Sequence, residues 1–555
     1  MDSLQIGIFL FITALIGFLT YLGCRNAPAG DRGSDKDYFL ANGGLSWYFV
    51  AGSITLTNLS TDQLVGMNGN QMLLLAWWEL AAVVGLLVLA FVFLPIYYRN
   101  NCTTTTELLQ RKYDNKHIRA VISVLFLLGN LFIFLPAILY GGSLFLKSTT
   151  GADFSGLFGE RLFTEIFVSA DPAKSGVDST ILIMSIAFAV IGALYAILGG
   201  LRAVAISDTY SGVLILSLAL LVVFLAMQAI NWDLSGVPRE RLDIFQGDTM
   251  VLDGVVEDNP IPWHTLLTGM IFIQIFYWST NQTITQRAMA SPTLAEARKG
   301  VLAAAGIRLL IVPVIVVLPG VVAYKLYGDV GDAAYGMIVG DILPPILSGA
   351  FAAAIAAAVL TTFNSILNAS AALYVCDIHE SYVEEARNVP KLSLYVSVVM
   401  TALAITLVPI FASQDSIINT VQQLYGLLSM PILSAFIVGL MFRNVSAWAA
   451  IIGVVAGVLV YAVTSFELYA GMRIGDYQVY PGLSLEEGLG QTLASVHYIH
   501  YMFVTLFVSI GVALLANAVI FGRKASLSFM RSKPPQSDKS DMFQDAKAGS
   551  ADPFA

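Results

Sequence analysis

Apolar runs of about 20 residues recur along the whole chain, which has 555 residues. A helix of that length spans the hydrocarbon core of a bilayer. The chain is 57% apolar and only 12% charged, with a mean hydropathy of +0.75, whereas a soluble protein is about 25% charged. We therefore expect an all-α polytopic membrane protein. The runs predict about 13 transmembrane helices, at 4–24, 45–69, 73–98, 118–147, 180–198, 204–231, 263–285, 298–327, 345–376, 391–412, 418–442, 445–466 and 499–522.

Two of these runs contain polar residues in mid-span. The stretch Thr57 to Gln63 carries a single apolar side chain, Leu59, and the stretch Ser279 to Thr283 has the same character. A polar group without a partner in hydrocarbon costs several kcal/mol. Either these residues stabilise a kink against neighbouring helices, or the helix breaks there to bind something.

The two interrupted runs divide the chain into matching sets. Without the first run and the last two, ten spans remain, and each set of five begins with an interrupted one. Because five is odd, the sets must have opposite topology, which is typical of transporters with an inverted repeat. We expect a first repeat at 45–231 and a second at 263–442. Residues 1–25 would be an additional transmembrane helix, 445–522 two peripheral helices, and 523–555 a disordered cytoplasmic tail.

The distribution of basic residues predicts the orientation. With the N-terminus outside, 21 of the 29 Lys and Arg residues fall in inner segments and 7 in outer ones, and Arg308 lies within a span. This bias follows the positive-inside rule. We therefore expect a multi-pass protein of the cell membrane with a cytoplasmic C-terminus and three long outer loops, at 148–179, 232–262 and 467–498. The acidic loop 232–262 is interpreted as a solvated face.

The span 345–376 offers ligands for an ion. Thr361 and Thr362 supply adjacent hydroxyls, and a broken helix exposes carbonyls that lack helical partners. Hydroxyls and carbonyls are hard, neutral ligands that suit a monovalent cation such as Na⁺. Alternatively, the threonines hydrogen-bond to their own helix.

Charged residues within spans are candidates for function. Asp208 could bind a second cation, carry a proton or cap a helix end near the inner interface. Glu79 lies near the outer end of its span. Arg308 could extend its guanidinium to the inner surface, since about seven residues separate it from the cytoplasmic end.

Other chemistries lack support. No nucleotide-binding or nucleic-acid motif and no nucleophile–base set is present, so we expect no enzyme and no nucleic-acid partner. His497 and His500, beside Tyr498 and Tyr501, favour an interfacial aromatic belt over a metal site.

Several short motifs in order carry a family resemblance. From Asp37 to Arg443 the chain resembles the sodium:solute symporters, most closely their sodium/sugar branch. The motifs are Asp37-Tyr38-Phe39-Leu40-Ala41, the stretch Asn58 to Gly66, Gly199-Gly200-Leu201 leading to Asp208, Tyr277-Trp278, Gln286-Arg287, Leu318-Pro319-Gly320, the stretch Ala356 to Asn368, and Gln422.

The resemblance implies two ion sites. The family's Na⁺ site uses carbonyls of the broken first core helix and two hydroxyl residues of the eighth. The positions that match it here are Leu56, Leu59, Ala358, Thr361 and Thr362. A second Na⁺ site in some members matches Asp208 and Ser365, although Asn364 stands where a hydroxyl is expected.

The resemblance also implies a solute site. Its polar positions match Gln63, Glu79, Gln274, Arg308 and Gln422. Tyr277 matches the aromatic residue that closes the site from the inside, with Trp278 beside it. Gln274 replaces a shorter amide, Arg308 a lysine and Trp78 a tyrosine, so the solute can differ from glucose or galactose.

Together these features predict a Na⁺-coupled symporter that imports a small polar solute, a sugar above all, by alternating access. A Na⁺-coupled carrier of a sugar acid, carboxylate or amino acid is the alternative. A proton-coupled carrier and a solute sensor or channel are further ones.

Overall fold

The structure is a computed structural model. It describes residues 3–25, 35–59, 61–165, 176–252, 255–383, 388–412, 414, 416–466, 473–474, 477–478 and 496–528. The chain is mostly helical, and nine helices of the described part are long and apolar enough to cross a membrane. The expectation of an all-α polytopic protein is therefore confirmed, while the total number of crossings stays a prediction.

Helices occupy the first predicted repeat, at boundaries within a few residues of the expected ones. In chain order they are α3 (Trp47–Asn58), α4 (Thr61–Gly69), η2 (Leu73–Leu75), α5 (Ala76–Val88), η3 (Leu89–Phe93), α6 (Leu94–Arg99), α7 (Thr105–Tyr113), α8 (Lys116–Gly129), η4 (Asn130–Phe134), α9 (Leu135–Thr150), α10 (Ser155–Phe158) and α11 (Ser179–Ala229). The helix α11 covers two predicted spans, 180–198 and 204–231, with 51 residues. A straight helix of that length would measure about 75 Å, more than twice the hydrocarbon thickness.

The second predicted repeat is equally helical. Its elements are η6 (Trp263–Leu267), α13 (Gly269–Ser279), α14 (Gln282–Met289), α15 (Leu294–Leu310), α16 (Val312–Tyr327), η7 (Gly331–Ala333), α17 (Ala334–Ile342), α18 (Pro345–Ala372), η8 (Leu373–His379), α19 (Glu380–Tyr382), α20 (Val389–Ala412) and α21 (Ile417–Met441).

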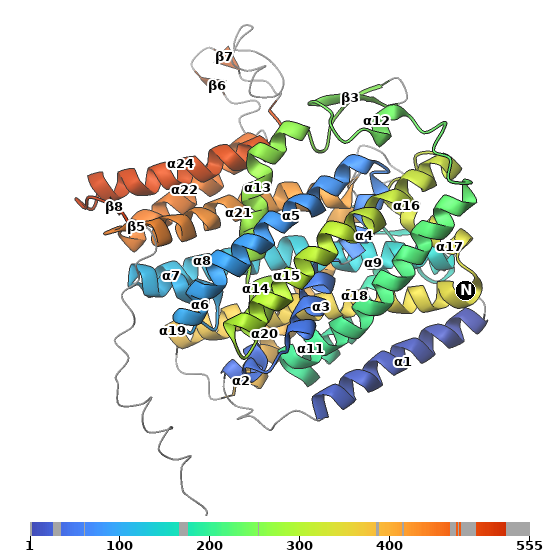
Figure 1. The fold of residues 1–555 in the computed structure, drawn as a ribbon, viewed down its shortest axis with the longest axis horizontal. Coiled ribbons are helices and arrows are strands. Elements are labelled where there is room, and N and C mark those ends of the chain that lie inside the picture. The colour runs from blue at the N-terminus through green and yellow to red at the C-terminus, as the bar shows by residue number, and fades with distance from the viewer. Residues whose placement is uncertain are drawn as a thin grey trace, which may run out of the picture.

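The remaining elements flank these two sets. They are α1 (Ser3–Arg25), α2 (Asp35–Leu40), η1 (Ala41–Gly43), α12 (Arg239–Leu242), α22 (Ala447–Ser465) and α24 (Tyr498–Val519). The helix α1 packs on α18 and α11 at one side of the bundle, and α22 and α24 lie side by side against α21 at the opposite side (Figure 1).

Short antiparallel strand pairs join the helices outside the bundle. They are β1 (Arg161–Leu162) with β2 (Val177–Asp178), β3 (Thr249–Leu252) with β4 (Val255–Asp258), β5 (Phe442–Arg443) with β8 (Ser526–Leu527), and β6 (Arg473–Ile474) with β7 (Tyr477–Gln478). The pairing of β8 with β5 corrects the expectation that the chain is disordered from 523 onward. Residues 529–555 of the expected tail lie outside the described residues.

Both polar interruptions are breaks in a helix. The helix α3 ends at Asn58, and Leu59 takes a non-helical conformation with φ −75° and ψ 63°. The second break follows Ser279, and Asn281 caps α14 by accepting a hydrogen bond from Thr283 N at 3.0 Å. A break leaves main-chain groups without helical partners at the centre of the bundle.

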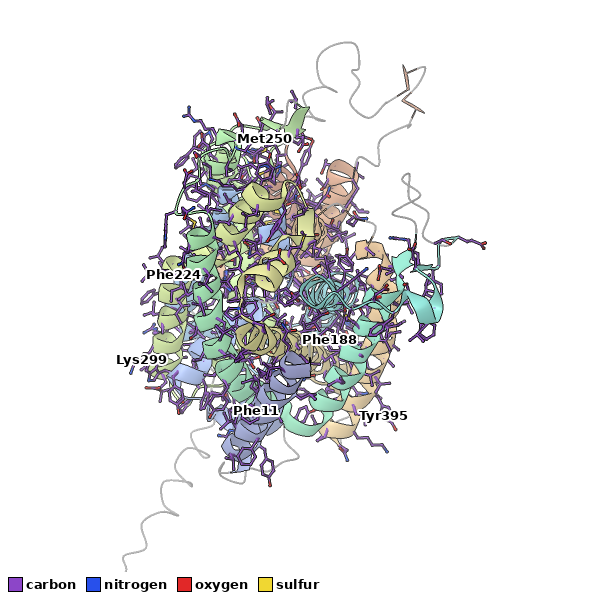
Figure 2. The ribbon with its side chains drawn as sticks, turned by 90° about the vertical axis from the view of Figure 1, so that its right-hand side faces the viewer. Phe11, Phe188, Phe224, Met250, Lys299 and Tyr395 are labelled. Carbon is purple, nitrogen blue, oxygen red and sulfur yellow. The ribbon has the colours of Figure 1, made fainter. Side chains whose placement is uncertain are left out.

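The sides of the bundle are apolar. Figure 2 shows Phe11, Phe224 and Tyr395 at the outer surface of the helices, where their side chains are 65%, 51% and 57% exposed. Many large apolar side chains on α1, α11, α20 and α24 are exposed in the same way. Such a surface suits lipid rather than water.

Candidate functional site

One pocket lies beside the first helix break. All seven residues that the sequence assigns to the solute line it, from α4, α5, α13, α15 and α21: Gln63, Glu79, Gln274, Tyr277, Trp278, Arg308 and Gln422. The rest of its wall comprises Asn58, Trp78, Ala82, Phe134, Ile273, Ile418, Val421 and Tyr425.

A buried ion pair forms one wall of this pocket. Arg308 Nη1 donates to Glu79 Oε2, and Gln63 Nε2 donates to Glu79 Oε1 at 2.8 Å. The Arg308 side chain is 0% exposed, so the alternative in which it extends to the inner surface is wrong. Its partner Glu79 holds the guanidinium inside, and the Trp278 ring lies 4.5 Å from it.

Two polar atoms of this wall keep hydrogen-bonding capacity. Gln63 Oε1 and Arg308 Nε are buried and have no hydrogen-bond partner among the described residues. Buried polar atoms are nearly always hydrogen-bonded in folded proteins. An acceptor and a donor thus remain for a ligand, next to an ion pair whose charges cancel.

Gln274 is bound into the protein more fully. Its Nε2 donates to Trp78 O at 2.7 Å, and its Oε1 accepts from Trp278 Nε1 at 2.9 Å. The close approach of α5 to α13 that allows these bonds depends on Gly85, where a Cβ would overlap the Gln274 carbonyl. Gln274 therefore orients the pocket wall and retains one amide proton for a ligand.

Aromatic rings form part of the pocket wall. Tyr277 accepts a hydrogen bond from Asn58 Nδ2 at 3.0 Å, and its ring lies 5.9 Å from that of Tyr425 and 6.4 Å from that of Phe134. Sequence reasoning assigned no role to Tyr425, Phe134 or Asn58. Tyr425 could have been found, because it follows Gln422 by three residues on the same helix face.

The predicted Na⁺ ligands lie where α3 meets α18. Leu56 and Leu59 are at the end of α3, and Ala358, Thr361 and Thr362 are on α18, which packs on α3 and α4. Thr361 Oγ1 donates to Ala358 O at 3.2 Å, so this hydroxyl bonds to its own helix, as the alternative proposed. Its oxygen lone pairs stay available to a cation.

Thr362 differs from its neighbour. Its hydroxyl is buried and makes no hydrogen bond with any described residue. Together with Thr57 it lines a second, smaller pocket, which shares Phe134 and Tyr277 with the first. An orphaned hydroxyl beside a helix break fits a hard monovalent cation such as Na⁺.

Asp208 lies close to this region and is fully buried. Its Oδ2 accepts from Ser53 at 2.7 Å and from Thr57 at 3.4 Å, and Arg287 Nη2 lies 3.7 Å away. The capping alternative for Asp208 is therefore wrong, because the carboxylate binds α3 in the middle of α11. Thr361 faces the same carboxylate.

The sequence misplaced Arg287, a further residue of this region. Arg287 was counted with the inner loops, but it is fully buried in α14 and its Nε donates to Ser53 Oγ at 2.7 Å. Ser365, which the resemblance matched with Asp208 to a second ion site, donates its hydroxyl to Thr361 O at 2.7 Å, and its part in such a site stays a prediction. Asn364 is buried with both amide atoms unpartnered among the described residues. The side chain of Asp62, which received no role, lies outside the described residues.

Comparison with known proteins finds relatives that match most of the chain. The uncharacterized symporter YidK of Escherichia coli is 31% identical over 488 residues, covering 84% of this chain and 79% of the relative. The sodium/glucose cotransporter of Vibrio parahaemolyticus is 28% identical over 465 residues, covering 77% and 79%.

The fold is also that of a solved transporter. The substrate-bound outward-open structure of a Na⁺-coupled sialic acid symporter aligns with a TM-score of 0.68 at 15% identity, covering 93% of this chain and 98% of that one. The sequence pattern of the family described as "Sodium:solute symporter family" matches residues 38–168 and 174–457. This protein is therefore a multi-pass membrane protein that belongs to the sodium:solute symporter family.

Proposed function

We propose that this protein is a Na⁺-coupled symporter that imports a neutral polyhydroxylated solute, a sugar above all, by alternating access. The observation that carries the proposal is the convergence of seven predicted residues from five helices on one pocket beside a helix break. Amide and carboxylate groups suit the hydroxyls of a sugar, and aromatic rings suit its C–H face.

The charge balance of the pocket favours a neutral solute. Glu79 binds the Arg308 guanidinium directly, so neither charge is available to pair with a charged ligand without breaking a buried ion pair. A lone arginine would favour a sugar acid or a carboxylate, which is the alternative that the sequence leaves open. The free donor on Arg308 and the free acceptor on Gln63 complement a hydroxyl group.

Coupling follows from the position of the break. We propose that Na⁺ binds the carbonyls of Leu56, Leu59 and Ala358 and the hydroxyls of Thr361 and Thr362, and that it stabilises the outward-open arrangement of α3 and α4. The solute then binds next to Gln63. The repeats at 45–231 and 263–442 rock against each other, and Na⁺ and solute leave on the inner side.

The energy of one Na⁺ limits the accumulation of solute. A potential of about 100 mV contributes roughly 2.3 kcal/mol per charge, and a tenfold Na⁺ gradient about 1.4 kcal/mol. One Na⁺ per cycle could therefore sustain a solute gradient of roughly 500-fold. The orientation needed for import, with the N-terminus outside, is the one that the basic residues favour.

Uptake into proteoliposomes tests this function. A panel of radiolabelled sugars, polyols, sugar acids and amino acids is assayed with an inward Na⁺ gradient, and we expect Na⁺-dependent uptake of a sugar or polyol. The variant with Thr361→Ala and Thr362→Ala should lose at least tenfold in apparent Na⁺ affinity. The matched control carries Thr401→Ala and Thr505→Ala, since these two hydroxyls are also buried without a partner among the described residues, but lie on α20 and α24.

The proposal makes two separable claims. Unchanged Na⁺ dependence in the Thr361 and Thr362 variant, with the control also unchanged, would refute the ion site. Uptake of a sugar acid or amino acid in preference to every neutral sugar would refute the solute class. Uptake driven by a proton gradient in the absence of Na⁺ would show that the coupling ion is H⁺ and not Na⁺.

A further inference from the structure

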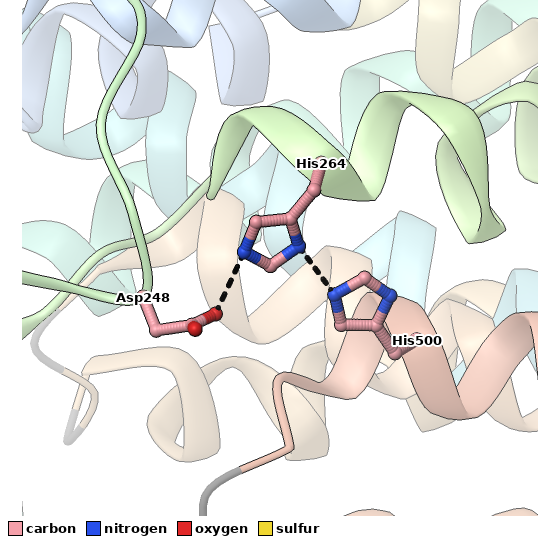
Figure 3. A group of neighbouring side chains, drawn as sticks. All are labelled: Asp248, His264 and His500. Atoms are coloured by element: carbon pink, nitrogen blue, oxygen red, sulfur yellow. Dashed lines mark hydrogen bonds and ion pairs between the residues drawn. The ribbon is translucent and has the colours of Figure 1, made fainter.

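Three side chains from distant parts of the sequence meet at one end of the molecule, away from the pocket. Asp248 comes from the segment between α12 and β3, His264 from η6 at the start of the second repeat, and His500 from the first turn of α24 (Figure 3). His264 Nε2 lies 3.1 Å from Asp248 Oδ1, and His264 Nδ1 lies 2.7 Å from His500 Nε2. The sequence favoured an aromatic belt for His500 because it could not show the other two residues nearby.

The hydrogen bonds around the two imidazoles bear on which ring nitrogens carry protons. Thr268 Oγ1 lies 3.2 Å from Thr265 O and 2.8 Å from His500 Nδ1. If the hydroxyl donates to that carbonyl, His500 Nδ1 must carry a proton and donate to the threonine. If His264 Nε2 also carries a proton, it donates to Asp248, whose Oδ1 lies 3.1 Å away. In this arrangement each of the two facing nitrogens bears a lone pair.

In the tautomers just described, the two lone pairs lie 2.7 Å apart and would repel each other unless a cation lies between or beside them. The imidazole planes are nearly parallel, differing by only 7°. A proton or a metal ion would relieve the repulsion. One carboxylate oxygen of Asp248 and one ring nitrogen of each imidazole lie within 4.8 Å of one another, a spacing that a single divalent ion could bridge once the side chains adjust.

We propose that Asp248, His264 and His500 form a binding site for a divalent transition metal such as Zn²⁺, Ni²⁺ or Co²⁺. Two imidazoles and one carboxylate are the donor set that such ions prefer, whereas Mg²⁺ and Ca²⁺ prefer oxygen ligands. The distance from metal to nitrogen in these sites is about 2.0–2.1 Å. The two facing nitrogens would have to separate by roughly half an ångström to reach tetrahedral spacing, which side-chain rotation can supply. Water can complete the coordination on the exposed side of Asp248.

Each ligand is held by its surroundings. Asn259 N donates to Asp248 O at 2.8 Å, and Asn259 Nδ2 donates to Gly247 O at 2.7 Å. This side chain therefore fixes the segment that presents the carboxylate. At the other side, Gly269 at the start of α13 packs directly on the Ile499 carbonyl, where a Cβ would overlap it. Such outer contacts orient ligands and tune the affinity of metal sites.

A metal ion here would connect segments that the proposed transport cycle moves. The helix α13 runs from Gly269 to Ser279 and carries Gln274, Tyr277 and Trp278 of the pocket. An ion shared by His264 and His500 would fasten its outer end to α24 and to the loop 232–262. This consequence, inhibition of transport by the metal, rests on the proposed function, whereas the binding of the metal does not.

Metal binding to the purified, full-length protein without a histidine tag is the test. Equilibrium dialysis against Zn²⁺ and Ni²⁺ gives stoichiometry and affinity, and the visible absorption of bound Co²⁺ reports nitrogen ligands. We expect one ion per chain. His264→Ala and His500→Ala should each weaken binding at least tenfold, while His379→Ala, which removes a histidine elsewhere, should leave it unchanged. Asp248→Asn is the variant least prone to misfold, since the Asp248 side chain is 58% exposed, and it should also weaken binding.

The possible outcomes separate the two parts of the proposal. No binding of Zn²⁺ or Ni²⁺ at millimolar concentration, which would leave the site to a proton, overturns it. Binding that all three variants retain overturns it too. Uptake measured with and without Zn²⁺ tests whether the metal fastens α13 to α24. Inhibition by Zn²⁺ in the parent protein and in His379→Ala, but not in His500→Ala, supports this fastening. Uptake that Zn²⁺ leaves unchanged in the parent protein overturns it. If no solute is taken up under any condition, the proposed function fails and the binding data still decide the metal site.

Discussion

Two buried Asp–Arg pairs differ in how fully the carboxylate is hydrogen-bonded. Asp377 in η8 accepts from Arg119 Nε at 2.6 Å and from Thr104 at 2.8 Å, and its other oxygen accepts from Thr106 and Ser123. Asp208 in α11 has Arg287 Nη2 at 3.7 Å, and its Oδ1 has no hydrogen bond in the described part of the chain. Both carboxylates are 0% exposed.

The difference lies in how completely each charge is satisfied. A buried charge is tolerated when hydrogen bonds and an opposite charge replace its hydration, as they do at Asp377. At Asp208 that replacement is incomplete, since its Oδ1 and the facing Arg287 Nη2 have no hydrogen bond among the described residues. The satisfied pair is a structural clamp. The unsatisfied pair lies beside the two helix breaks, where we propose that an ion binds.

The largest effect is expected from removing the structural clamp. Asp377→Ala leaves Arg119 as an uncompensated charge and removes the acceptor of three hydroxyls, so we expect a loss of about 3–5 kcal/mol in the free energy of unfolding. Thermal unfolding and the yield of folded protein in detergent measure it. Arg111→Ala is the control, because Arg111 forms its ion pair with Glu107 near the surface. The loss of that ion pair should cost less than about 1 kcal/mol in the free energy of unfolding. Equal effects of the two variants would contradict the assignment of a clamp.

A smaller effect on stability, but a larger one on transport, is expected at the other pair. Asp208→Asn keeps the shape of the side chain and an acceptor for Ser53, so the cost should be about 1–3 kcal/mol. If the carboxylate attracts Na⁺ to the site, the apparent Na⁺ affinity of uptake falls at least tenfold, equivalent to about 1.4 kcal/mol. If Asp208→Asn is as unstable as Asp377→Ala yet retains its Na⁺ dependence, then Asp208 has a structural role and does not attract the ion.

These pairs also show what sequence can and cannot reveal. Hydropathy located the spans because the bilayer imposes a length on every helix, and the polar stretches at Thr57 and Ser279 located both breaks for the same reason. The pocket residues were found through short motifs. The partners of the buried charges were not found, because Arg287 and Asp208 are 79 positions apart in the sequence and no local pattern links them. The cluster of Asp248, His264 and His500 escaped for the same reason.

A third carboxylate, Asp332 in η7, extends the comparison of Asp377 with Asp208. The effect expected from changing it is the smallest of the three. It lies outside the membrane-spanning helices and accepts a hydrogen bond from Ile417 N at 3.0 Å, and no described cation forms a salt bridge with it. Burial raises its pKa to about 7, although the bond from Ile417 opposes this. The folded state then binds a proton that the unfolded state releases near its ordinary pKa of 3.8, so stability falls as the pH rises from about 4 to about 7 and is level above that.

Because Asp332 keeps some exposure to solvent, we expect the pH effect on melting temperature to be small, on the order of one or two degrees between pH 5 and pH 8. Asp332→Asn should remove this slope, since the amide does not titrate and can still accept from Ile417 N. Asp329→Asn, three residues away in the same loop and paired with Arg241 at 2.9 Å, is the matched control and should leave the slope in place. A slope that persists in Asp332→Asn would mean that this carboxylate is as well satisfied as Asp377. In that case, the number of hydrogen bonds to a carboxylate would not by itself distinguish carboxylates with a structural role from those that titrate or bind an ion in this protein.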